Sequence, residues 1–450
     1  MKTALIILAA GKGTRMDSDL PKVLHPVAQA PLLEHAMASA ASLEPAHTIV
    51  VAGHGLDAVR DAALNFDDTA VVVEQAEQLG TAHAAAQAKD ALSGFDGAAL
   101  VLFGDTPFLQ AETLEKMVAA LATHDVVVLG FEPVDTKRYG RLVMHGDALE
   151  RIVEHKDATA DERAITLCNG GVTACRAPLL FDLIAQIKDD NASGEYYLTD
   201  VVELARKRGL SATAVTCAES ETLGVNSRAD LAAADRLFQT TARAALQGNG
   251  VTLMSPDSVY LARDTAIGRD ARVEPNVVFG PGVTVESGAT IRAFSHLEGC
   301  HVSRGAIVGP YARLRPGAEL SENVRVGNFV EIKNARIAEG AKVNHLSYIG
   351  DATIGASANI GAGTITCNYD GVMKHHTYIG ERAFIGSNTM LVAPVSIGKG
   401  AMTGSGSVIT SDVGSDALAL ARAPQVEKPG MAKKLFDMLK AKKAKIQRDR

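Results

Sequence analysis

A six-residue repeat in the second half of the chain constrains the fold more than any other feature of the sequence. Between residues 267 and 397, with a few shifts of phase and one interruption, every sixth position carries an aliphatic residue or phenylalanine. These positions are Ile267, Val273, Phe279, Val285, Ile291, Leu297, Val302, Val308, Leu314, Leu320, Val326, Ile332, Ile337, Val343, Ile349, Ile354, Ile360, Ile379, Ile385, Leu391 and Ile397. The period is typical of a parallel β-helix, in which three short strands form one coil and coils stack about 4.8 Å apart.

The interruption of the repeat, residues 361–378, is predicted to leave the coil as an external loop. Such a loop can be a tolerated insertion or can carry function. We favour function, because binding residues are concentrated on loops that a rigid scaffold positions.

The first half has a different pattern, in which short aliphatic runs alternate with segments of helical spacing. The predicted strands are Thr3–Ala9, Thr48–Ala52, Ala70–Val73, Ala98–Phe103 and Asp125–Gly130, and predicted helices include Leu32–Ser42 and Ala82–Leu92. This alternation predicts an α/β domain with a mostly parallel, Rossmann-like sheet covered by helices on both faces. Ligands of such sheets bind at the carboxyl ends of the strands, so we expect functional residues there.

An amphipathic helix is predicted over Ser227–Gln247, because its apolar residues recur three or four positions apart before a Gly-Asn-Gly sequence ends it. We therefore expect an α/β domain at residues 1–226, a linker helix at 227–249, the β-helix at 250–425 and a basic tail at 426–450.

The tail differs sharply in charge from the rest of the chain. Residues 433–450 contain eight Lys or Arg and two Asp, a net charge of +6, so the remainder carries −7 − 6 = −13. Residues 431–446 are predicted to form a basic amphipathic helix. A solvated tail is the favoured interpretation, and contact with a membrane surface or a partner is the alternative.

Composition excludes several classes of protein. A net charge of −7 argues against a general nucleic-acid binder. Five cysteines without a C-x-x-C spacing indicate neither a disulfide framework nor a cysteine zinc site. The opening apolar run, residues 4–10, is too short to span a bilayer and does not have the pattern of a signal peptide. We expect a cytoplasmic protein with no membrane span.

A glycine-rich loop follows the first predicted strand. Residues 8–16 read LAAGKGTRM, and Lys22 lies shortly after them. Small residues let backbone N–H groups approach phosphate oxygens, and Arg15 and Lys22 add positive charge, so the loop predicts a phosphate site. It is not the dinucleotide fingerprint, because Met16 replaces the third glycine, and it is not a P-loop, because Ile6 replaces the first.

Further polar and glycine residues follow other predicted strands. Asp105 comes directly after the strand that ends at Phe103, where a carboxylate can bind Mg²⁺ or cap a helix, and the residue alone does not decide between them. The remaining candidates, individually indistinct from turn residues, are Gln75, Gly80, Thr81, Tyr139, Gly140, Glu154, Asn169, Gly170, Gly171 and Asn226.

In the β-helix, cationic residues surround one histidine. Arg315 and Lys333 are expected on the coil surface, His345 and Tyr348 follow, and Lys374 lies in the predicted loop. A histidine can take a proton from an attacking amine while cations hold an anionic substrate, which favours His345 as a general base. The adjacent pair at positions 375 and 376 is expected to be loop surface.

Taken together, these motifs resemble the bacterial bifunctional N-acetylglucosamine-1-phosphate uridylyltransferase/glucosamine-1-phosphate N-acetyltransferase family over essentially the full chain. The motifs that carry the resemblance are LAAGKGTRM at 8–16, QAEQLGT at 75–81, GDTP at 104–107, NGG at 169–171 and CNYDG at 367–371. The resemblance implies a nucleotidyltransferase-type sheet, a left-handed β-helix and a homotrimer that binds acetyl-CoA between neighbours. It also implies synthesis of UDP-N-acetylglucosamine, a precursor of peptidoglycan and lipopolysaccharide.

For the first half, the resemblance implies UTP as substrate, with Mg²⁺ held by Asp105 and Asn226. Arg15 and Lys22 would neutralise the triphosphate. The implied nucleotide and sugar contacts are Leu8, Ala9, Ala10, Gly11, Lys22, Gln75, Gly80, Thr81, Phe103, Gly104, Asp105, Gly140, Glu154, Asn169 and Asn226. Position 103 departs from the family, which commonly has Tyr there.

For the second half, the resemblance implies that His345 is the general base for acetylation of glucosamine-1-phosphate. The implied amino-sugar-phosphate contacts are Arg315, Lys333, Tyr348, Asn359 and Lys374. The implied acetyl-CoA contacts are Ala362, Asn368, Tyr369, Ser387, Ser405 and Arg422.

Two alternatives remain at the level of sequence. One is a nucleotidyltransferase of another sugar-1-phosphate whose β-helix is only structural. The other is a regulatory subunit that keeps both folds without catalysis, against which the presence of Arg15, Lys22, Asp105 and His345 argues.

Overall fold

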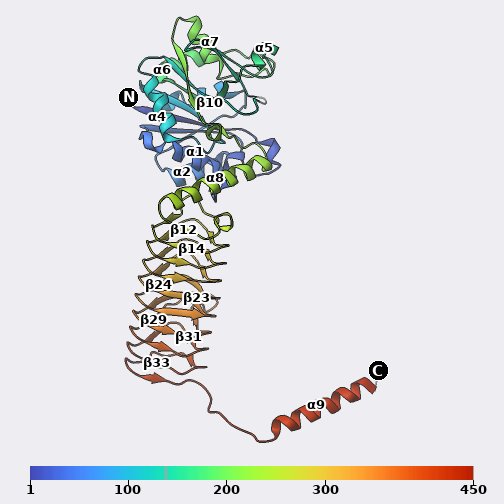
Figure 1. Ribbon diagram of the computed structural model, residues 1–450, viewed down its shortest axis with the longest axis vertical. Helices are drawn as coiled ribbons and strands as arrows, with labels where there is room; N and C mark the ends of the chain where they lie inside the picture. Colours follow the sequence, from blue (N-terminus) through green and yellow to red (C-terminus); the bar gives the residue numbers. More distant parts are fainter. Residues whose placement is uncertain (137–138, 449–450) are drawn as a thin grey trace. The chain divides into compact units, whose positions relative to one another are not determined.

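The computed structural model describes residues 1–136 and 139–448 of the 450 in the chain, so the last two residues of the predicted tail lie outside the described residues (Figure 1). The chain divides into two compact units. The first comprises Met1–Ala245 and Tyr260–Arg263, and the second comprises Leu246–Val259 and Asp264–Arg450.

The first unit is built on a nine-stranded sheet whose main path runs β11-β7-β10-β6-β1-β4-β5. The strands are β1 (Thr3–Ala9), β4 (His47–Ala52), β5 (Val71–Glu74), β6 (Ala98–Phe103), β7 (Val126–Phe131), β8 (Arg141–His145), β9 (Ala148–Val153), β10 (Cys168–Arg176) and β11 (Ala212–Cys217). Only β10 is antiparallel to its neighbours on this path, and β8 and β9 form a hairpin beside it. The predicted mostly parallel sheet is confirmed.

Helices cover both faces of this sheet, as predicted. Alternate residues of β1 point to opposite faces: Ile6 packs in a core cluster with residues of α3, α6 and α7, and Ile7 packs in a second cluster with residues of α1, α2 and α4. The helices are α1 (Leu32–Ser39), α2 (Leu56–Phe66), α3 (Thr81–Ala86), α4 (Ala111–Ala120), α5 (Ala160–Arg163), α6 (Ala177–Ile184) and α7 (Asp200–Lys207). The helix predicted over Ala82–Leu92 was too long, because α3 ends at Ala86 and a separate 3₁₀ turn covers Asp90–Leu92.

The predicted long helix is α8 (Arg228–Gly248). Its Gln239 side chain is buried and bonds both backbone groups of Leu261, donating to the carbonyl over 2.8 Å and accepting from the N–H over 2.9 Å. Arg263 pairs with Glu34 at 2.5 Å. These contacts explain why Tyr260–Arg263 belongs to the first unit.

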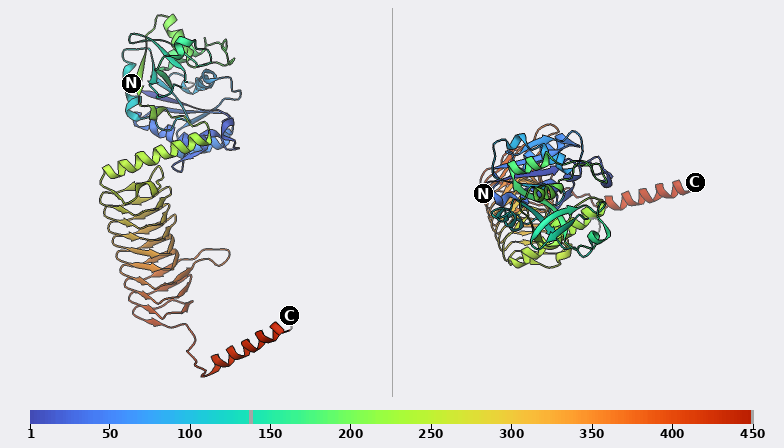
Figure 2. Two further views of the ribbon diagram at one scale, coloured as in Figure 1. Left: turned by 45° about the vertical axis from the view of Figure 1, so that its right-hand side comes forward. Right: turned by 90° about the horizontal axis from the view of Figure 1, so that it is seen from above.

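The second unit is a stack of three-sided coils in which all paired main strands are parallel (Figures 1 and 2). One face consists of β12 (Thr252–Leu253), β14 (Arg272–Val273), β17 (Thr290–Ile291), β20 (Ile307–Val308), β23 (Arg325–Asn328), β25 (Lys342–His345), β27 (Asn359–Ile360), β30 (Phe384–Ile385), β33 (Met402–Thr403) and β35 (Leu418–Ala419). Two strands are long enough to continue across a corner, β24 (Glu331–Ile337) and β26 (Tyr348–Ile354).

The other two faces share these two long strands. The second face contains β13 (Ala266–Ile267), β16 (Thr284–Val285), β19 (Cys300–Val302), β22 (Ala318–Leu320), β29 (Thr377–Ile379) and β32 (Val395–Ile397). The third contains β15 (Val278–Phe279), β18 (His296–Leu297), β21 (Arg313–Leu314), β28 (Ile365–Cys367), β31 (Met390–Val392) and β34 (Val408–Ile409). The predicted parallel hexapeptide β-helix is confirmed.

The six-residue repeat marks the inside of the coils. Every repeat position is buried except Ile267, in the first complete coil, which is partly exposed. The structure adds inward positions that an aliphatic rule misses: Thr366 and Thr403 fall six residues after Ile360 and Ile397 and are also buried. Their hydroxyls bond backbone groups inside the coil, which offsets the cost of burying them.

The external loop is shorter than predicted. Within the predicted range 361–378, Ile365–Cys367 forms β28 and pairs with β26 and β31, and Thr377–Ile379 forms β29. The excursion is therefore confined to residues 368–376. The sequence analysis missed this coil strand because its inward residue, Thr366, is polar and does not fit an aliphatic repeat.

The predicted tail helix is present as α9 (Met431–Arg448). Within residues 1–136 and 139–448, no helix is both long enough and apolar enough to cross a membrane.

Candidate active sites

The first candidate site lies at the carboxyl ends of neighbouring strands. Leu8 belongs to the end of β1, Phe103 ends β6, and Gln75 follows β5. They line a pocket of about 290 Å³, to which ten predicted residues contribute: Leu8, Ala9, Ala10, Gly11, Lys22, Gln75, Gly80, Thr81, Phe103 and Asp105. Arg15, Gly104, Gly140, Glu154, Asn169 and Asn226 do not line this pocket.

Two predicted cations meet two predicted oxygen ligands beside the pocket. The Lys22 ammonium contacts the Asp105 carboxylate and lies 3.2 Å from Oδ1 of Asn226. Arg15 donates to the same Asn226 oxygen over 3.0 Å. The backbone N–H of Asn226 donates to Asp230 at 3.1 Å, so the start of α8 positions this side chain.

This arrangement tests the proposed Mg²⁺ ligands. Asp105 and Asn226 direct one oxygen each toward a single cationic atom, the Lys22 nitrogen, so the two oxygens converge as ligands of one cation must. Among the described residues no group of three or more His, Cys, Asp or Glu is placed to hold a metal. Two protein oxygens fit Mg²⁺, which keeps several waters and substrate phosphates as ligands. Capping by Asp105 is not observed, since α4 begins after Gln110.

The predicted sugar-binding residues form a separate patch. The Asn169 N–H donates to the Gly140 carbonyl over 2.9 Å. A Cβ at Gly140 would lie 3.3 Å from a carboxylate oxygen of Glu154, so glycine leaves room for that side chain. Burial, followed by the nearby charge of Asp157, raises the pKa of Glu154.

This patch is connected to the nucleotide pocket through the predicted Asn-Gly-Gly sequence. Asn169 accepts a bond of 3.0 Å from the Gly171 N–H. A Cβ at Gly171 would lie 2.9 Å from the ring of Phe103, which lines the pocket. Gly171 therefore lets the aromatic ring pack against the turn.

Sequence reasoning did not single out four residues that line the pocket. They are Val23, Gln78, Ala84 and Glu195. Gln78 lies inside the quoted QAEQLGT motif and donates to the Gln75 carbonyl over 3.1 Å, so the motif could have indicated it. Glu195 comes from a distant segment with no recognisable pattern.

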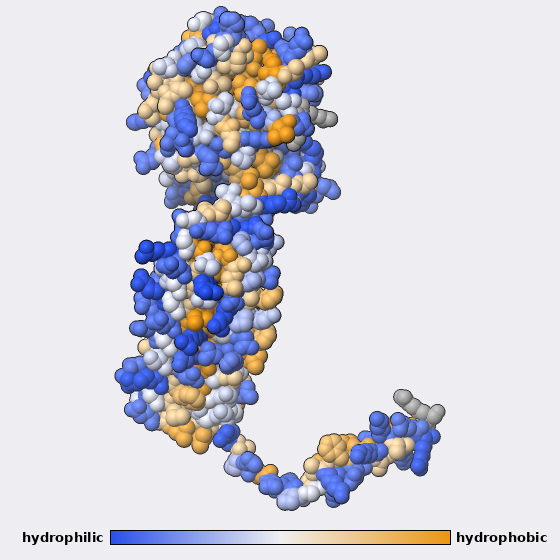
Figure 3. Space-filling model, in the orientation of Figure 1, coloured by the Kyte–Doolittle hydropathy of each residue, from blue (hydrophilic) through white to orange (hydrophobic). Residues whose placement is uncertain are grey.

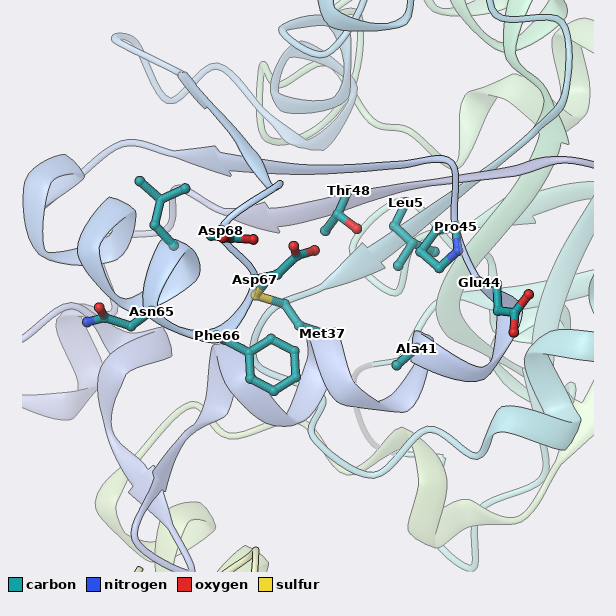
Figure 4. Close-up of a pocket in the computed structure, with 11 residues that line it drawn as sticks. Leu5, Met37, Ala41, Glu44, Pro45, Thr48, Asn65, Phe66, Asp67 and Asp68 are labelled. Atoms are coloured by element: carbon teal, nitrogen blue, oxygen red, sulfur yellow. The ribbon is translucent and has the colours of Figure 1, made fainter. Parts of the chain in front are cut away.

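A larger pocket, of about 660 Å³, lies elsewhere in the first unit (Figure 4). Leu5 and Thr48, near the amino ends of β1 and β4, line it, as do Glu44, Asp67 and Asp68. Its position at the opposite ends of the strands and its acidic side chains do not suit a nucleotide, whose phosphates are negative.

The second candidate site gathers three cations on the β-helix. Arg315 pairs with Glu331 at 2.9 Å. The pKa of Lys333 is lowered, chiefly by its contact with the Lys374 ammonium and next by Arg315. Lys374 comes from the loop, so the loop returns a cation to the coil surface, where a phosphate would relieve the repulsion.

A carboxylate that the sequence analysis missed supports this cation cluster. Asp351 is buried and accepts bonds from Asn368 and, over 2.6 Å, from Asn334. Burial alone would raise the pKa of Asp351, but the two amide bonds and the charges of Lys374 and Lys333 outweigh it and lower the pKa. The adjacent residue, Gly350, has no Cβ to collide with the Tyr348 hydroxyl.

His345 is held by Asn328 of the preceding coil. The Nδ1 atom of His345 lies 2.8 Å from Oδ1 of Asn328. Because an amide oxygen only accepts, Nδ1 carries the proton and Nε2 keeps the lone pair that a general base requires. Asn328 was missed by sequence analysis, although its offset of 17 residues from His345 is one coil length.

Several predicted acetyl-CoA residues follow His345 down one corner of the stack. Backbone bonds connect His345 to Gly363, Ala362 to Asn388 and Ser387 to Gly406. The column continues through Ser405, whose carbonyl accepts from the Arg422 side chain over 2.7 Å. At about 4.8 Å per coil, the four steps from His345 to Arg422 span about 19 Å.

Three predicted residues lie outside this column. Asn368 contacts Asp351 beside the cation cluster, and the Tyr369 hydroxyl donates within the loop to Gly371 over 2.6 Å. Asn359 belongs to β27, on a different face from β24 with Lys333, and is paired with Lys342 and Phe384.

The two loop histidines, expected as loop surface, are partly exposed and each also bonds a neighbouring side chain. His375 bonds the Asp370 carboxylate over 2.7 Å, and His376 bonds Thr353 of the coil over 2.9 Å. The His375 bond, followed by two backbone N–H bonds, lowers the pKa of Asp370. These contacts fix the base of the loop that carries Lys374.

The fold and its two sites thus define a nucleotidyltransferase joined to a hexapeptide-repeat acyltransferase, and comparisons with known proteins agree. Residues 5–171 match the MobA-like NTP transferase domain family, and residues 376–411 match the bacterial transferase hexapeptide family. A solved structure of UDP-glucose pyrophosphorylase complexed with UDP-glucose is 19% identical, covers 54% of this chain and 100% of its own, and has a TM-score of 0.45. At this distance the similarity carries no further argument.

Curated relatives match the whole chain. It is 69% identical over 448 residues to the bifunctional protein GlmU of Roseobacter denitrificans and 72% identical over 449 residues to that of Ruegeria pomeroyi, with 100% of each chain covered in both cases. The chain therefore belongs to the bifunctional GlmU family, the uridylyltransferase/acetyltransferase enzymes of UDP-N-acetylglucosamine synthesis. The predicted family and enzyme class are confirmed.

Proposed function

We propose that this chain first acetylates glucosamine-1-phosphate in its second unit and then transfers UMP from UTP to the N-acetylated product in its first unit. The observation that carries the proposal is the position of His345. It stands at the head of the corner column that leads to Arg422, in the coil that follows the one carrying Lys333 of the cation cluster. In this proposal one base serves both an extended thioester bound along the column and a sugar phosphate held by the cations.

In the acetylation step, the cation cluster holds the phosphate of the amino sugar. The Nε2 atom of His345 takes a proton from the substrate amine as its nitrogen attacks the thioester carbonyl. The new C–N bond forms, the C–S bond breaks, and coenzyme A leaves as its thiolate. Asn328 keeps the imidazole in the tautomer that can accept this proton.

In the uridylyl step, a phosphate oxygen of N-acetylglucosamine-1-phosphate attacks the α-phosphorus of UTP. The bond from that phosphorus to the bridging oxygen breaks, and pyrophosphate leaves. Arg15 and Lys22 neutralise charge on the triphosphate, and the pocket around Leu8 and Gln75 fixes the nucleotide. Gly140, Glu154 and Asn169 hold the sugar.

We further propose that Asp105 and Asn226 hold Mg²⁺. Their convergence on the Lys22 nitrogen supports this assignment. When bound, the ion supplies positive charge to the phosphate oxygens. Arg15 and Lys22, which contact these two residues, would position the triphosphate.

A homotrimer is the proposed assembly, in the cytoplasm. Supporting it is an exposed ladder on the β-helix, in which the rings of Phe294, Tyr311 and Phe329 stack with centroids 4.9 and 5.3 Å apart and Leu346 occupies the corresponding corner. All four residues have φ between 53° and 59°, a strained conformation for large side chains. The ladder borders a pocket of about 400 Å³ that Glu331 and Tyr348 also line, so a neighbouring copy over it would enclose the amino-sugar site.

The experiment that tests the function is mass spectrometry of products formed from glucosamine-1-phosphate, acetyl-CoA and UTP with Mg²⁺, each reactant omitted in turn. We expect UDP-N-acetylglucosamine only with all three, and N-acetylglucosamine-1-phosphate when UTP is left out. Acetyl-CoA that remains unconsumed beside glucosamine-1-phosphate would refute the acetylation step and indicate a structural β-helix. Absence of pyrophosphate with the acetylated sugar supplied would refute the uridylyl step.

A further inference from the structure

The helix α9 (Met431–Arg448) has an apolar side that nothing in the described part of the chain covers. All its residues are exposed, and no residue of the segment 421–430 before it is buried. At 100° per residue, five apolar side chains fall within an arc of about 100°. They are Met431, Leu435, Met438, Leu439 and Ile446, whereas Phe436 lies about 60° beyond the arc. Their exposed fractions range from 41% for Met431 to 64% for Phe436.

The remaining surface of α9 is strongly basic. Its cations are Lys433, Lys434, Lys440, Lys443, Lys445 and Arg448, against the single acidic residue Asp437. Figure 3 shows hydrophobic and hydrophilic surfaces side by side along this helix. An exposed apolar arc on a helix of one charge sign is the pattern of helices that lie in a membrane interface.

We propose that α9 binds the surface of an anionic phospholipid bilayer, with its apolar arc among the headgroups and its lysines on the lipid phosphates. The helix is too polar to cross the bilayer. Attraction between the lysines and the lipid phosphates contributes one part of the binding free energy, and burial of the apolar arc contributes the other. Lys442, which falls inside the arc, can extend its ammonium to the phosphates while its stem stays in the interface.

Two other partners fit the helix less well. A second copy of α9 would place like charges together, because cations flank the apolar arc on both sides. A nucleic acid would pair with the lysines but leave Leu435, Leu439 and Phe436 in water. Of these partners, only an anionic surface with an apolar interior pairs with the lysines and also buries the apolar side chains.

The segment that precedes α9 allows this contact. The last strand of the β-helix, β35, ends at Ala419, and residues 421–430 are exposed and include two prolines and a glycine. Ala421 and Arg422 still bond the coil, and the eight residues 423–430 reach up to about 26 to 29 Å when extended. The helix can therefore meet a surface without disturbing the coil.

The test measures binding of the full chain to vesicles of phosphatidylcholine alone and of phosphatidylcholine mixed with phosphatidylglycerol. We expect binding only to the anionic vesicles. Removal of residues 431–450 should abolish it and leave both transferase activities unchanged, since α9 has no buried residue. Failure of the full chain to bind anionic vesicles, or equal binding by the truncated chain, would overturn the proposal.

A matched pair of variants separates insertion from charge. Leu439→Glu and Ala444→Glu each add one negative charge, on the apolar arc and on the polar side respectively. Ala444→Glu should weaken binding about fivefold, the effect of one charge at the surface. Leu439→Glu should weaken it about fiftyfold or more, because it also loses the burial of a leucine. Equal losses would contradict insertion of the arc and indicate a polyanion as the partner.

A fluorescent reporter gives an independent readout. The chain contains no tryptophan, so Met438→Trp introduces a single indole within the apolar arc. Its emission should shift to the blue with anionic vesicles and be quenched by lipids brominated on their acyl chains. Emission that stays that of a solvated indole while the protein sediments with vesicles would refute the apolar contact.

Discussion

The two active sites are assembled in opposite ways. In the first unit, Lys22 meets Asp105 and Asn226 across sequence separations of 83 and 204 residues, because strand order and the start of α8 bring them together. In the second unit, Asn328 meets His345 across 17 residues, because that is one coil. The comparison teaches that a solenoid encodes its contacts in the spacing of its repeat, whereas a sheet with crossover connections encodes them in its topology.

The loop insertion shows how robust the coil register is. Steps of 17 or 18 residues separate most members of the His345 column, but the step from Ala362 to Ser387 takes 25. The corner contact survives, since the Asn388 N–H still donates to the Ala362 carbonyl over 2.7 Å. The extra residues leave at the edge of the coil and return with Lys374, so the insertion adds a cation without shifting the column.

The largest expected effects test whether the two sites are independent. His345→Ala should lower the rate of acetylation by a factor of roughly 10² to 10⁴, the range for loss of a general base, and leave uridylyl transfer unchanged. Asp105→Ala should abolish uridylyl transfer and leave acetylation unchanged. Separate assays of coenzyme A release and pyrophosphate release would measure both, and loss of both activities from either substitution would break the comparison.

Much of the fold could be predicted because its patterns are local. The repeat identified the inside of the coils, and the ranges Thr3–Ala9 and Ala98–Phe103 match β1 and β6. The antiparallel strand β10 could not be predicted from the alternation of strands and helices, since its direction depends on which neighbours it pairs with. Thr366 was missed because its inward position is satisfied by hydrogen bonds rather than by hydrophobicity.

In the candidate sites, too, residues in local motifs could be predicted and residues brought together by the topology could not. Residues of contiguous motifs, such as Leu8 and Gln75, could be singled out from the sequence and do share a pocket. Glu195 could not, because only the folded sheet brings its segment to that pocket. Asn328 could have been found by stepping back one coil from His345, which shows that the repeat predicts contacts as well as burial.

The next largest effect is expected on acetylation, when the contact between Asn328 and His345 of successive coils is removed. Asn328→Ala removes the acceptor for Nδ1 of His345, so we expect kcat for acetylation to fall by roughly ten- to a hundredfold through loss of the correct tautomer. KM for acetyl-CoA should change little. Asn328→Asp keeps an oxygen acceptor and should retain most of the activity. Steady-state kinetics of the three proteins would decide, and a rise in KM alone would assign Asn328 to binding.

A third prediction sharpens the account of the repeat. Thr366→Val makes an inward position apolar but removes the hydroxyl that accepts from the Gly350 N–H over 2.8 Å. We expect the free energy of unfolding to fall by about 1 to 3 kcal/mol, because a buried donor loses its partner. Thr366→Ser keeps the hydroxyl and is the matched control. Urea denaturation would measure both variants, and a Val variant as stable as the parent would mean that hydrophobicity alone governs the inner face.

The smallest effect concerns the titration of Asp200 in the first unit, whose neighbouring charges come from its own helix and from a distant segment. Burial, then Glu203 and Asp157, raises the pKa of Asp200 to about 6. The unfolded chain has an Asp pKa of about 3.9, so the folded state binds more protons between these values and loses stability as pH rises through them. Asp200→Asn should therefore stabilise the protein above about pH 6, by about 1 kcal/mol after solvent screening.

Below about pH 4 the advantage of Asp200→Asn should vanish, because Asp200 is then protonated in both the folded and the unfolded state. Urea denaturation followed by helix circular dichroism at about pH 7.5 and about pH 4 would measure it, with the exposed Asp189→Asn as control, expected to change stability little at either pH. An equal effect of Asp200→Asn at both pH values would show that the folded protein does not raise the pKa of Asp200 and that the substitution acts on stability by another route.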